Sequence, residues 1–316
     1  LNSVSMDKIS FNLWLNNMAE QCVQIIAVYY HLLLIFLMPL LVSLLLLYLI
    51  VTPWWPIVLL YLTWFIYDHK SPKRGGYPST WCRTLSIHKY FARYFPIHLH
   101  ITTPLKYGKN YLIGSHPHGI ISMNTYANFI TNGTGLFEKL PGMTIRVCTL
   151  VSQFWIPVRR EWAMLHGLID CSKESLHYVL NSSINNVAVL IEEQKKRWTH
   201  IPVSNPEGSY LRYFQSKLKK IMKYSLPIYH GCGLFSNFGP LPYRQVSKFI
   251  FDVNLNQIFK PIDTVIGIPI PVIKKKNPTE EEIDRLHELY INALTTLFET
   301  HKTQFGVPKN ASLIIR

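Results

Sequence analysis

The strongest constraint on the fold is a long stretch of the chain without a charged side chain. Although 16% of all residues are charged, the 47 residues between Glu20 and Asp68 include no Asp, Glu, Lys or Arg. Residues 23–51 are mostly apolar and exceed the length of about 20 residues that a helix needs to cross a bilayer. A second apolar run, residues 57–67, is too short to cross a bilayer by itself. These two runs predict that residues 21–67 form a membrane segment.

The break between the two apolar runs predicts a hairpin. Residues 52–56 read Thr-Pro-Trp-Trp-Pro, and proline ends helices while tryptophan favours the bilayer interface. Two spans, or one span with a re-entrant arm, both fit this pattern. Lys70, Lys73 and Arg74 follow the second arm, and basic flanks remain on the cytosolic side. We therefore expect both termini in the cytosol. The apolar region is too long for a cleaved signal peptide.

The remaining residues have the composition of a globular protein. We expect a cytosolic tail at residues 1–20 and a folded domain at residues 68–316. The net charge of +14 favours contact with anionic lipid headgroups or a phosphorylated substrate, while a solvated basic face is the alternative. The absence of a nucleic-acid-binding motif argues against nucleic acid as a partner. The five cysteines include no CxxC pair, which argues against a disulfide framework and a zinc site.

The pattern of the folded domain indicates an α/β fold. From residue 84 onward, short apolar runs alternate with helical patterns. Residues 111–114 predict a buried strand and residues 120–130 predict a helix, with the turn His116-Pro117-His118-Gly119 between them. This order places both histidines at the carboxyl end of a strand and at the beginning of a helix. Open α/β sheets build their sites at such positions.

Two further elements are predicted near the carboxyl terminus. Residues 265–272 contain two prolines, so they can form at most an edge strand. Thr279 and Glu282 have the spacing of a capping box, and apolar residues follow at intervals of three and four. We expect a packing helix from this box to near Gly306, without a chemical role.

The two histidines of the turn allow three interpretations. Histidine has an unperturbed pKa of about 6.5 and can act as base and then as acid near neutral pH. A positioned general base contributes roughly 10² to 10⁴ in rate. His116 and His118 can instead supply two metal ligands, or form a turn without chemistry. Because a metal site needs further ligands at strand ends and none is evident in the sequence, we expect no metal.

Several short motifs occur in an order that decides among these interpretations. They are Tyr94-Phe95-Pro96, GSHPHG at 114–119, FEKLPG at 137–142, PVRRE at 157–161, NPEGS at 205–209, LPIYHGCG at 226–233 and FGPLPYR at 238–244. This set resembles the acyl-CoA:monoacylglycerol and diacylglycerol acyltransferase family, the branch that includes wax-alcohol acyltransferases. The resemblance covers nearly all of residues 20–190 and 203–316. It implies an acyltransferase domain at 68–316 on a membrane hairpin in the endoplasmic reticulum. It also implies that the domain faces the cytosol and often spreads onto lipid droplets.

The resemblance also implies roles for individual residues. Some relatives have Glu-Pro-His-Gly in the turn, which makes His118 the candidate base. His118 takes the proton from an acylglycerol hydroxyl, which attacks the thioester of acyl-CoA without a metal or nucleotide cofactor. His116 orients His118 or donates to the developing oxyanion. Gly119 lines the substrate site. Arg160 and Glu161 match the family's Arg-Glu pair, which either contacts phosphate and scaffolds the site or forms a buried ion pair.

The chain departs from the family in two places. Residues 191–202 stand where relatives carry a segment several tens of residues long, and residues 245–260 are additional. Two functions therefore stay open: an active acylglycerol O-acyltransferase, and an inactive membrane-bound relative that binds lipid or partners. The sequence does not determine whether the acyl acceptor is monoacylglycerol, diacylglycerol or a long-chain alcohol. It also does not determine whether the protein forms a homo-oligomer.

Overall fold

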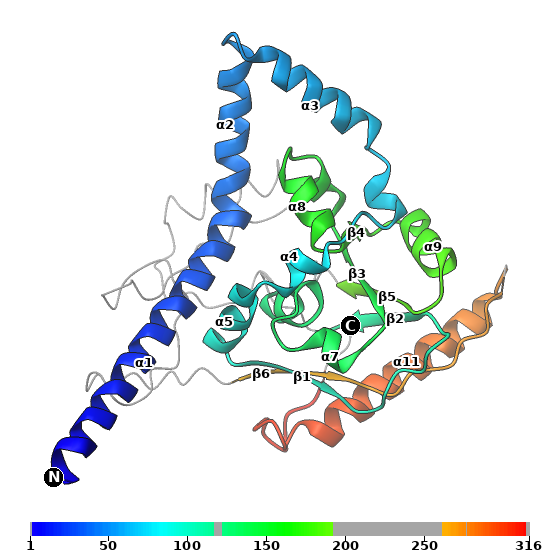
Figure 1. Ribbon diagram of the computed structural model, residues 1–316. Helices are drawn as coiled ribbons and strands as arrows, with labels where there is room; N and C mark the ends of the chain where they lie inside the picture. Colours follow the sequence, from blue (N-terminus) through cyan, green and yellow to red (C-terminus); the bar gives the residue numbers. More distant parts are fainter. Residues whose placement is uncertain (1, 117–121, 192–260, 276, 314–316) are drawn as a thin grey trace, which may run out of the picture.

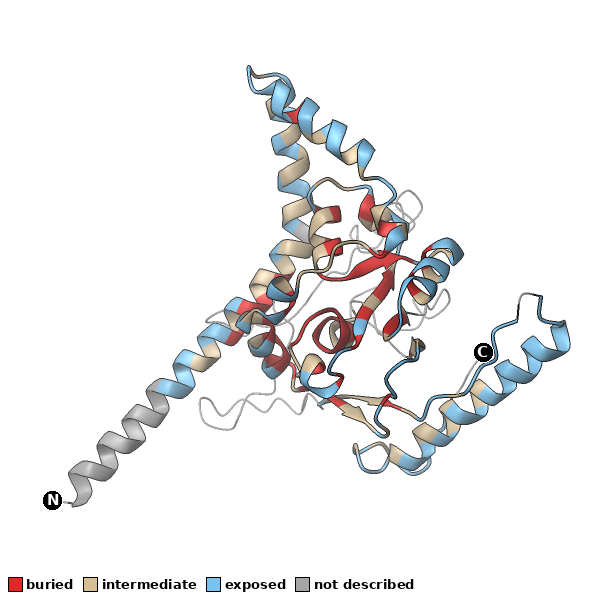
Figure 2. Cartoon of the chain, turned by 45° about the vertical axis from the view of Figure 1, so that its right-hand side comes forward, coloured by how far each residue is buried: buried red, intermediate tan, exposed pale blue. Residues whose placement is uncertain are grey.

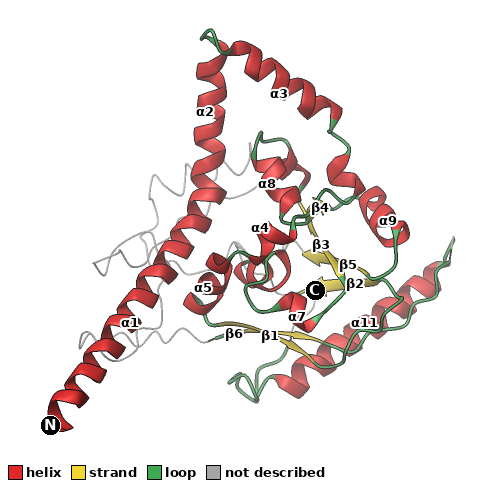
Figure 3. Ribbon diagram, viewed as in Figure 1, coloured by secondary structure: helices red, strands yellow, loops and turns green. Residues whose placement is uncertain are grey.

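The computed structural model describes residues 2–116, 122–191, 261–275 and 277–313. Within this part, a long N-terminal helical rod packs against an α/β domain, and a C-terminal helix lies on the other side of the domain (Figure 1; Figure 3). Both sheets of the domain contain parallel strands. The predicted mixed α/β class is confirmed.

The N-terminal rod consists of two helices joined through a π-helical turn. Helix α1 (Asn2–Leu32) continues through η1 (Leu33–Leu37) into α2 (Met38–Ile50). Pro39 lies in the first turn of α2, where its missing N–H removes one bond of the helical ladder, and the adjoining π turn accommodates this loss. After residues 51–54 the chain turns, and α3 (Trp55–Tyr67) leads back toward the domain (Figure 1).

The apolar residues of this rod divide into a packed part and an exposed part. Ala27, Val28 and His31 are buried where α1 meets α5 (Ser86–Tyr94), and the His31 ring lies 4.8 Å from that of Phe91. Beyond residue 33 the large apolar side chains of α2 and α3 are mostly exposed (Figure 2). An exposed apolar surface of this length is typical of a membrane contact.

The described residues contain one helical stretch, Asn16–Ile35, that is long and apolar enough to cross a membrane. Helices α2 and α3 are apolar but shorter. The first predicted span, residues 23–51, therefore comprises the packed end of α1, η1 and the exposed helix α2.

The main sheet has four parallel strands in the order β2-β5-β3-β4. Their bounds are β2 Tyr111–Ser115, β5 Asn186–Ile191, β3 Thr144–Thr149 and β4 Leu168–Asp170. Val187, Ala188 and Val189 of the central strand β5 are fully buried, as is typical of a strand covered on both faces. In the other central strand, β3, only Ile145, Val147 and Cys148 are buried. The prediction that residues 111–114 form a strand is confirmed, but the prediction of burial is wrong. Among the described strands β2 is at one edge of this sheet, and its Leu112 is 54% exposed.

A second, smaller sheet pairs two segments that are far apart in the chain. Strand β1 (Ile97–Ile101) runs parallel to β6 (Ile262–Ile266). The strand predicted at residues 265–272 begins and ends earlier in the structure. Its end precedes Pro269 and Pro271, which cannot donate to a ladder.

Short helices connect the strands, and one long helix lies near the carboxyl terminus. They are η2 (Ser71–Arg74), α4 (Thr80–Thr84), α6 (Met123–Thr125), η3 (Tyr126–Ile130), α7 (Leu136–Lys139), η4 (Val151–Phe154), α8 (Arg159–Leu165), α9 (Lys173–Ser182) and α11 (Glu280–His301). The helix predicted over 120–130 corresponds to α6 and η3. The capping box of Thr279 and Glu282 is confirmed, but α11 ends at His301, before Gly306.

Candidate functional site

The predicted catalytic turn begins at the carboxyl end of β2. Ser115 ends this strand and His116 follows directly, whereas Pro117, His118 and Gly119 lie outside the described residues. The register of the sheet pairs Ser115 with Ile191, the last residue of β5. His116 therefore lies at the carboxyl edge of a parallel sheet, where the sequence predicts it and where sites of this class are built.

The side chain of His116 contacts the C-terminal helix. Its Nε2 lies 2.6 Å from the hydroxyl oxygen of Tyr290 in α11, and the two rings meet edge to face with centroids 5.9 Å apart. Gly114 makes this approach possible, because a Cβ atom at that position would lie 2.3 Å from the Tyr290 hydroxyl oxygen.

The sequence pattern of α11 indicates packing alone, so Tyr290 is not predicted as a site residue from the sequence. One feature of the sequence could have indicated this contact: Tyr290 is a tyrosine on the apolar stripe of an amphipathic helix. A packed phenol needs a partner for its hydroxyl group, so such a residue marks a polar contact within an apolar face.

Arg160 and Glu161 belong to a separate buried network. Arg160 is 1% exposed, and its guanidinium donates to Oδ2 of Asp68 at 2.6 Å and to Oε1 of Glu161 at 2.9 Å. The same group also donates to the backbone carbonyl of Asp68 and lies over the ring of Phe65, with 5.1 Å between Cζ and the ring centroid. Of the two interpretations of this Arg-Glu pair, the geometry corresponds to the buried ion pair.

Tyr61 extends this network into the second apolar arm. Its hydroxyl donates to Oε2 of Glu161 at 3.0 Å and accepts from the backbone N–H of Val158 at 2.9 Å. Val158 has a φ of 63°, a conformation that is strained for a β-branched residue. The network therefore links α3 to the start of α8.

Two further histidines, His88 and His166, are buried in the domain. The Nε2–H of His88 donates to the carbonyl of Cys82, and the Tyr126 hydroxyl donates to its Nδ1. The Nδ1–H of His166 donates to the carbonyl of Trp162. Burial lowers the pKa of His166 to about 4 and also lowers the pKa of His88. Both rings are therefore neutral at physiological pH and have a structural role in the core.

The metal interpretation of His-x-His requires more ligands. Within the described ranges, no group of three or more His, Cys, Asp or Glu side chains lies close enough together to hold a metal ion. Such a site would need ligands from the rest of the chain.

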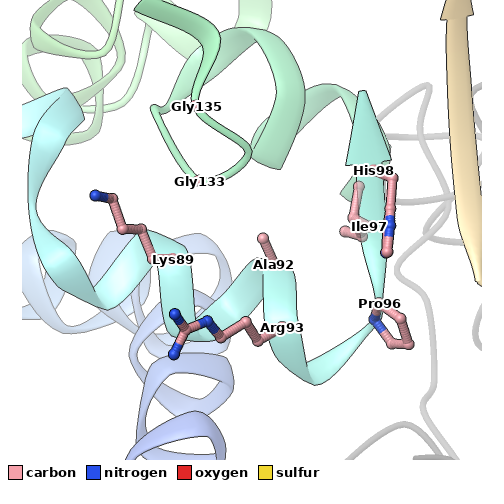
Figure 4. A pocket seen from close by; sticks show the side chains of 8 residues that line it. All are labelled: Lys89, Ala92, Arg93, Pro96, Ile97, His98, Gly133 and Gly135. Atoms are coloured by element: carbon pink, nitrogen blue, oxygen red, sulfur yellow. The ribbon is translucent and has the colours of Figure 1, made fainter. Parts of the chain in front are cut away.

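An open pocket of about 450 Å³ lies between α5 and the start of β1 (Figure 4). Lys89, Arg93 and His98 supply its polar side chains, and Arg93 pairs with Glu20 of α1 at 3.0 Å. Neither His116 nor Arg160 lines this pocket, so it is distinct from both groups described above.

Comparison with known proteins assigns the chain to a family. The model of the diacylglycerol acyltransferase family matches residues 47–193 and 199–316. The chain is 38% identical to 2-acylglycerol O-acyltransferase 1 of Bos taurus over 304 residues, which covers 83% of this chain and 86% of the relative. It is 32% identical to diacylglycerol O-acyltransferase 2 of Homo sapiens over 343 residues, which covers 95% of this chain and 84% of the relative. No solved structure matches significantly.

The comparisons also bear on the shortened region. The family match is interrupted at residues 194–198, within the segment 191–202. The alignment with the human relative is longer than the 316 residues of the chain, so that relative carries residues that this chain lacks. The interruption does not alter the assignment, because the match resumes and continues to residue 316. The chain belongs to the diacylglycerol acyltransferase family.

Proposed function

We propose that this protein transfers an acyl group from acyl-CoA to the hydroxyl group of a mono- or diacylglycerol. The observation that carries the proposal is the position of His116, which opens a His-Pro-His-Gly turn at the carboxyl end of a parallel strand. Family membership supports it, since relatives with 38% and 32% identity are named acylglycerol O-acyltransferases.

His118 acts as the general base in this proposal. It removes the proton from the acceptor hydroxyl, whose oxygen attacks the carbonyl carbon of the thioester. The tetrahedral intermediate then collapses as the carbon–sulfur bond breaks, and the protonated His118 gives its proton to the leaving thiolate. The products are the acylated glycerolipid and free coenzyme A, and neither a metal nor a nucleotide cofactor is required. His116 donates to the developing oxyanion or orients His118.

The exposed apolar surface of α2 and α3 supports a membrane location for the reaction. We propose that this surface inserts into the endoplasmic reticulum membrane as a hairpin, with the domain on the cytosolic side. Tyr61, in the middle of α3, contacts Glu161 of the domain, and Asp68, directly after α3, contacts Arg160. In this arrangement the Arg-Glu pair fixes the domain to the membrane arm. Gly119, which lies outside the described residues, is proposed as a substrate-binding residue of the turn.

A second candidate is a catalytically inactive, membrane-bound member of the family that binds lipid or a partner. The shortened segment after β5 favours it. Since Ile191 pairs with Ser115, the described part of β5 ends beside the residue that precedes the turn.

The test is acyl transfer from labelled acyl-CoA to mono- and diacylglycerol in microsomes. It compares the chain as it stands with a chain in which the segment after Ile191 is restored. In the active form, His118→Ala should reduce the rate by roughly 10² or more. His116→Ala should cost less, and His177→Ala, at an exposed position of α9, is the matched control. If His118→Ala and His116→Ala lose the same amount of activity, and added zinc restores it in both, the assignment of His118 as the base is overturned.

A further inference from the structure

We infer that Tyr290 is a positioning residue of the catalytic turn, holding the imidazole of His116 in place from the C-terminal helix. The inference rests on the proposed function only for its consequence in catalysis. The contact itself is the 2.6 Å approach of the Tyr290 hydroxyl oxygen to Nε2 of His116.

Local hydrogen bonds close both ends of helix α11, which carries Tyr290. At its start, Thr279 accepts from the backbone N–H of Glu282, and the Glu282 carboxylate accepts from the N–H of Thr279. After its last turn, Lys302 donates to the carbonyl of Ala311 at 2.9 Å. A helix with both ends closed in this way is a stable element, and sites built on helices keep their geometry better than sites on loops.

Gly114 of β2 leaves the space that the contact between Tyr290 and His116 requires. A Cβ atom at this position would lie 2.3 Å from the Tyr290 hydroxyl oxygen and 2.9 Å from Nε2 of His116. Real Cβ atoms do not approach other atoms so closely, so a side chain there would displace the phenol or the imidazole. Residue 114 is thus limited to glycine by the pairing of Tyr290 with His116.

The contact also bears on the tautomer of His116. A neutral imidazole has one donor and one acceptor nitrogen, and the partner of one nitrogen fixes the proton on the other. When the phenol donates to Nε2, the proton resides on Nδ1. His116 is then a fixed donor at the first position of the turn, which suits the orientation of His118 or the binding of an oxyanion.

The first test measures the contact and does not depend on activity. In the full chain in detergent, the rate at which diethylpyrocarbonate modifies His116 is followed by mass spectrometry. Tyr290→Phe should raise this rate about 3- to 10-fold, the ratio that corresponds to a hydrogen bond of about 1 kcal/mol. His177 and His287, both exposed, serve as internal references and should not change. An unchanged rate at His116 would overturn the inference.

The second test uses the form that is active in the acyl-transfer assay. Tyr290→Phe should lower kcat about tenfold with little change in KM for acyl-CoA, and it should have little further effect when His116 is already alanine. Equal losses in both backgrounds would show that Tyr290 acts independently of His116 and would overturn the inference. Gly114→Ala should cost more in the original chain than in the Tyr290→Phe variant, because that variant lacks the clashing hydroxyl. If labelling changes but no form transfers acyl groups, the positioning contact stands and the proposed function fails.

Discussion

Nη2 of Arg160 lies 2.6 Å from Oδ2 of Asp68, so a buried ion pair joins α8 to the residue that caps the end of α3. The two side chains are 1% and 10% exposed. The second carboxylate oxygen of Asp68 accepts from the Ser71 hydroxyl, and Glu161 completes the network. A charge in such a position is costly to leave without its partner.

Arg160→Met should therefore reduce the stability of the protein by about 3 kcal/mol. The change leaves the largely buried carboxylate of Asp68 and the partly exposed carboxylate of Glu161 without their charge partner. Thermal unfolding in detergent measures the loss. Arg93→Met is the matched control, since Arg93 and Glu20 form a pair whose side chains are 61% and 44% exposed. That control should change stability by less than about 0.5 kcal/mol. A raised KM for acyl-CoA at unchanged stability would instead favour a phosphate-binding role for Arg160.

The topology of the apolar arms can be tested directly. If α2 and α3 insert as a hairpin, both termini face the cytosol, as the basic residues after α3 predict. Protease treatment of sealed microsomes should then remove tags placed at either end of the chain. A tag at residue 1 that stays protected while the C-terminal tag is removed would indicate a single span.

Restoring the segment that relatives carry after Ile191 should convert a chain with little or no acyl transfer into an active one. The physical reason is the register that pairs Ile191 with Ser115, directly before His116. The described part of β5 therefore ends beside the residue that precedes the turn. We expect the restored segment to supply a hydrogen-bond partner without which His118 is poorly oriented. Microsomes that express both forms at equal levels provide the measurement. Robust synthesis by the chain as it stands would refute this prediction and direct attention to Glu192 and Glu193.

Acid should destabilise the domain through His166. Its folded pKa is about 4, lowered first by burial and further by His88, Arg83 and Arg159. The unfolded chain binds this proton near pH 6.5, so the contribution of neutral His166 is fully present above pH 6.5 and is lost as the pH falls toward 4. Between pH 7 and pH 5 the loss should be about 2 kcal/mol.

Thermal unfolding at several pH values measures this loss. His166→Phe should flatten the pH dependence between pH 7 and pH 5. His177→Phe, at an exposed position, should leave it unchanged. The same slope in the His166 variant and in the original chain would assign the acid sensitivity to other groups.

The amino-acid sequence alone determined the features that depend on neighbouring residues. The charge-free run predicted the apolar arms, since apolar length is a local property. The spacing of Thr279 and Glu282 predicted the start of α11, because a capping box closes within four residues. The turn at residue 116 was predicted at the end of a strand because proline and glycine interrupt regular structure wherever they occur.

Only the tertiary structure decided which distant residues meet. Tyr290 reaches His116 across 174 positions of the chain, and Arg160 reaches Asp68 across 92. Leu112 is exposed on β2, which is an edge strand among those described, and the apolar sequence of β2 itself does not specify that exposure. Such contacts arise when separate elements pack together. The local pattern around each residue does not specify its partner, and the packing of the whole domain does.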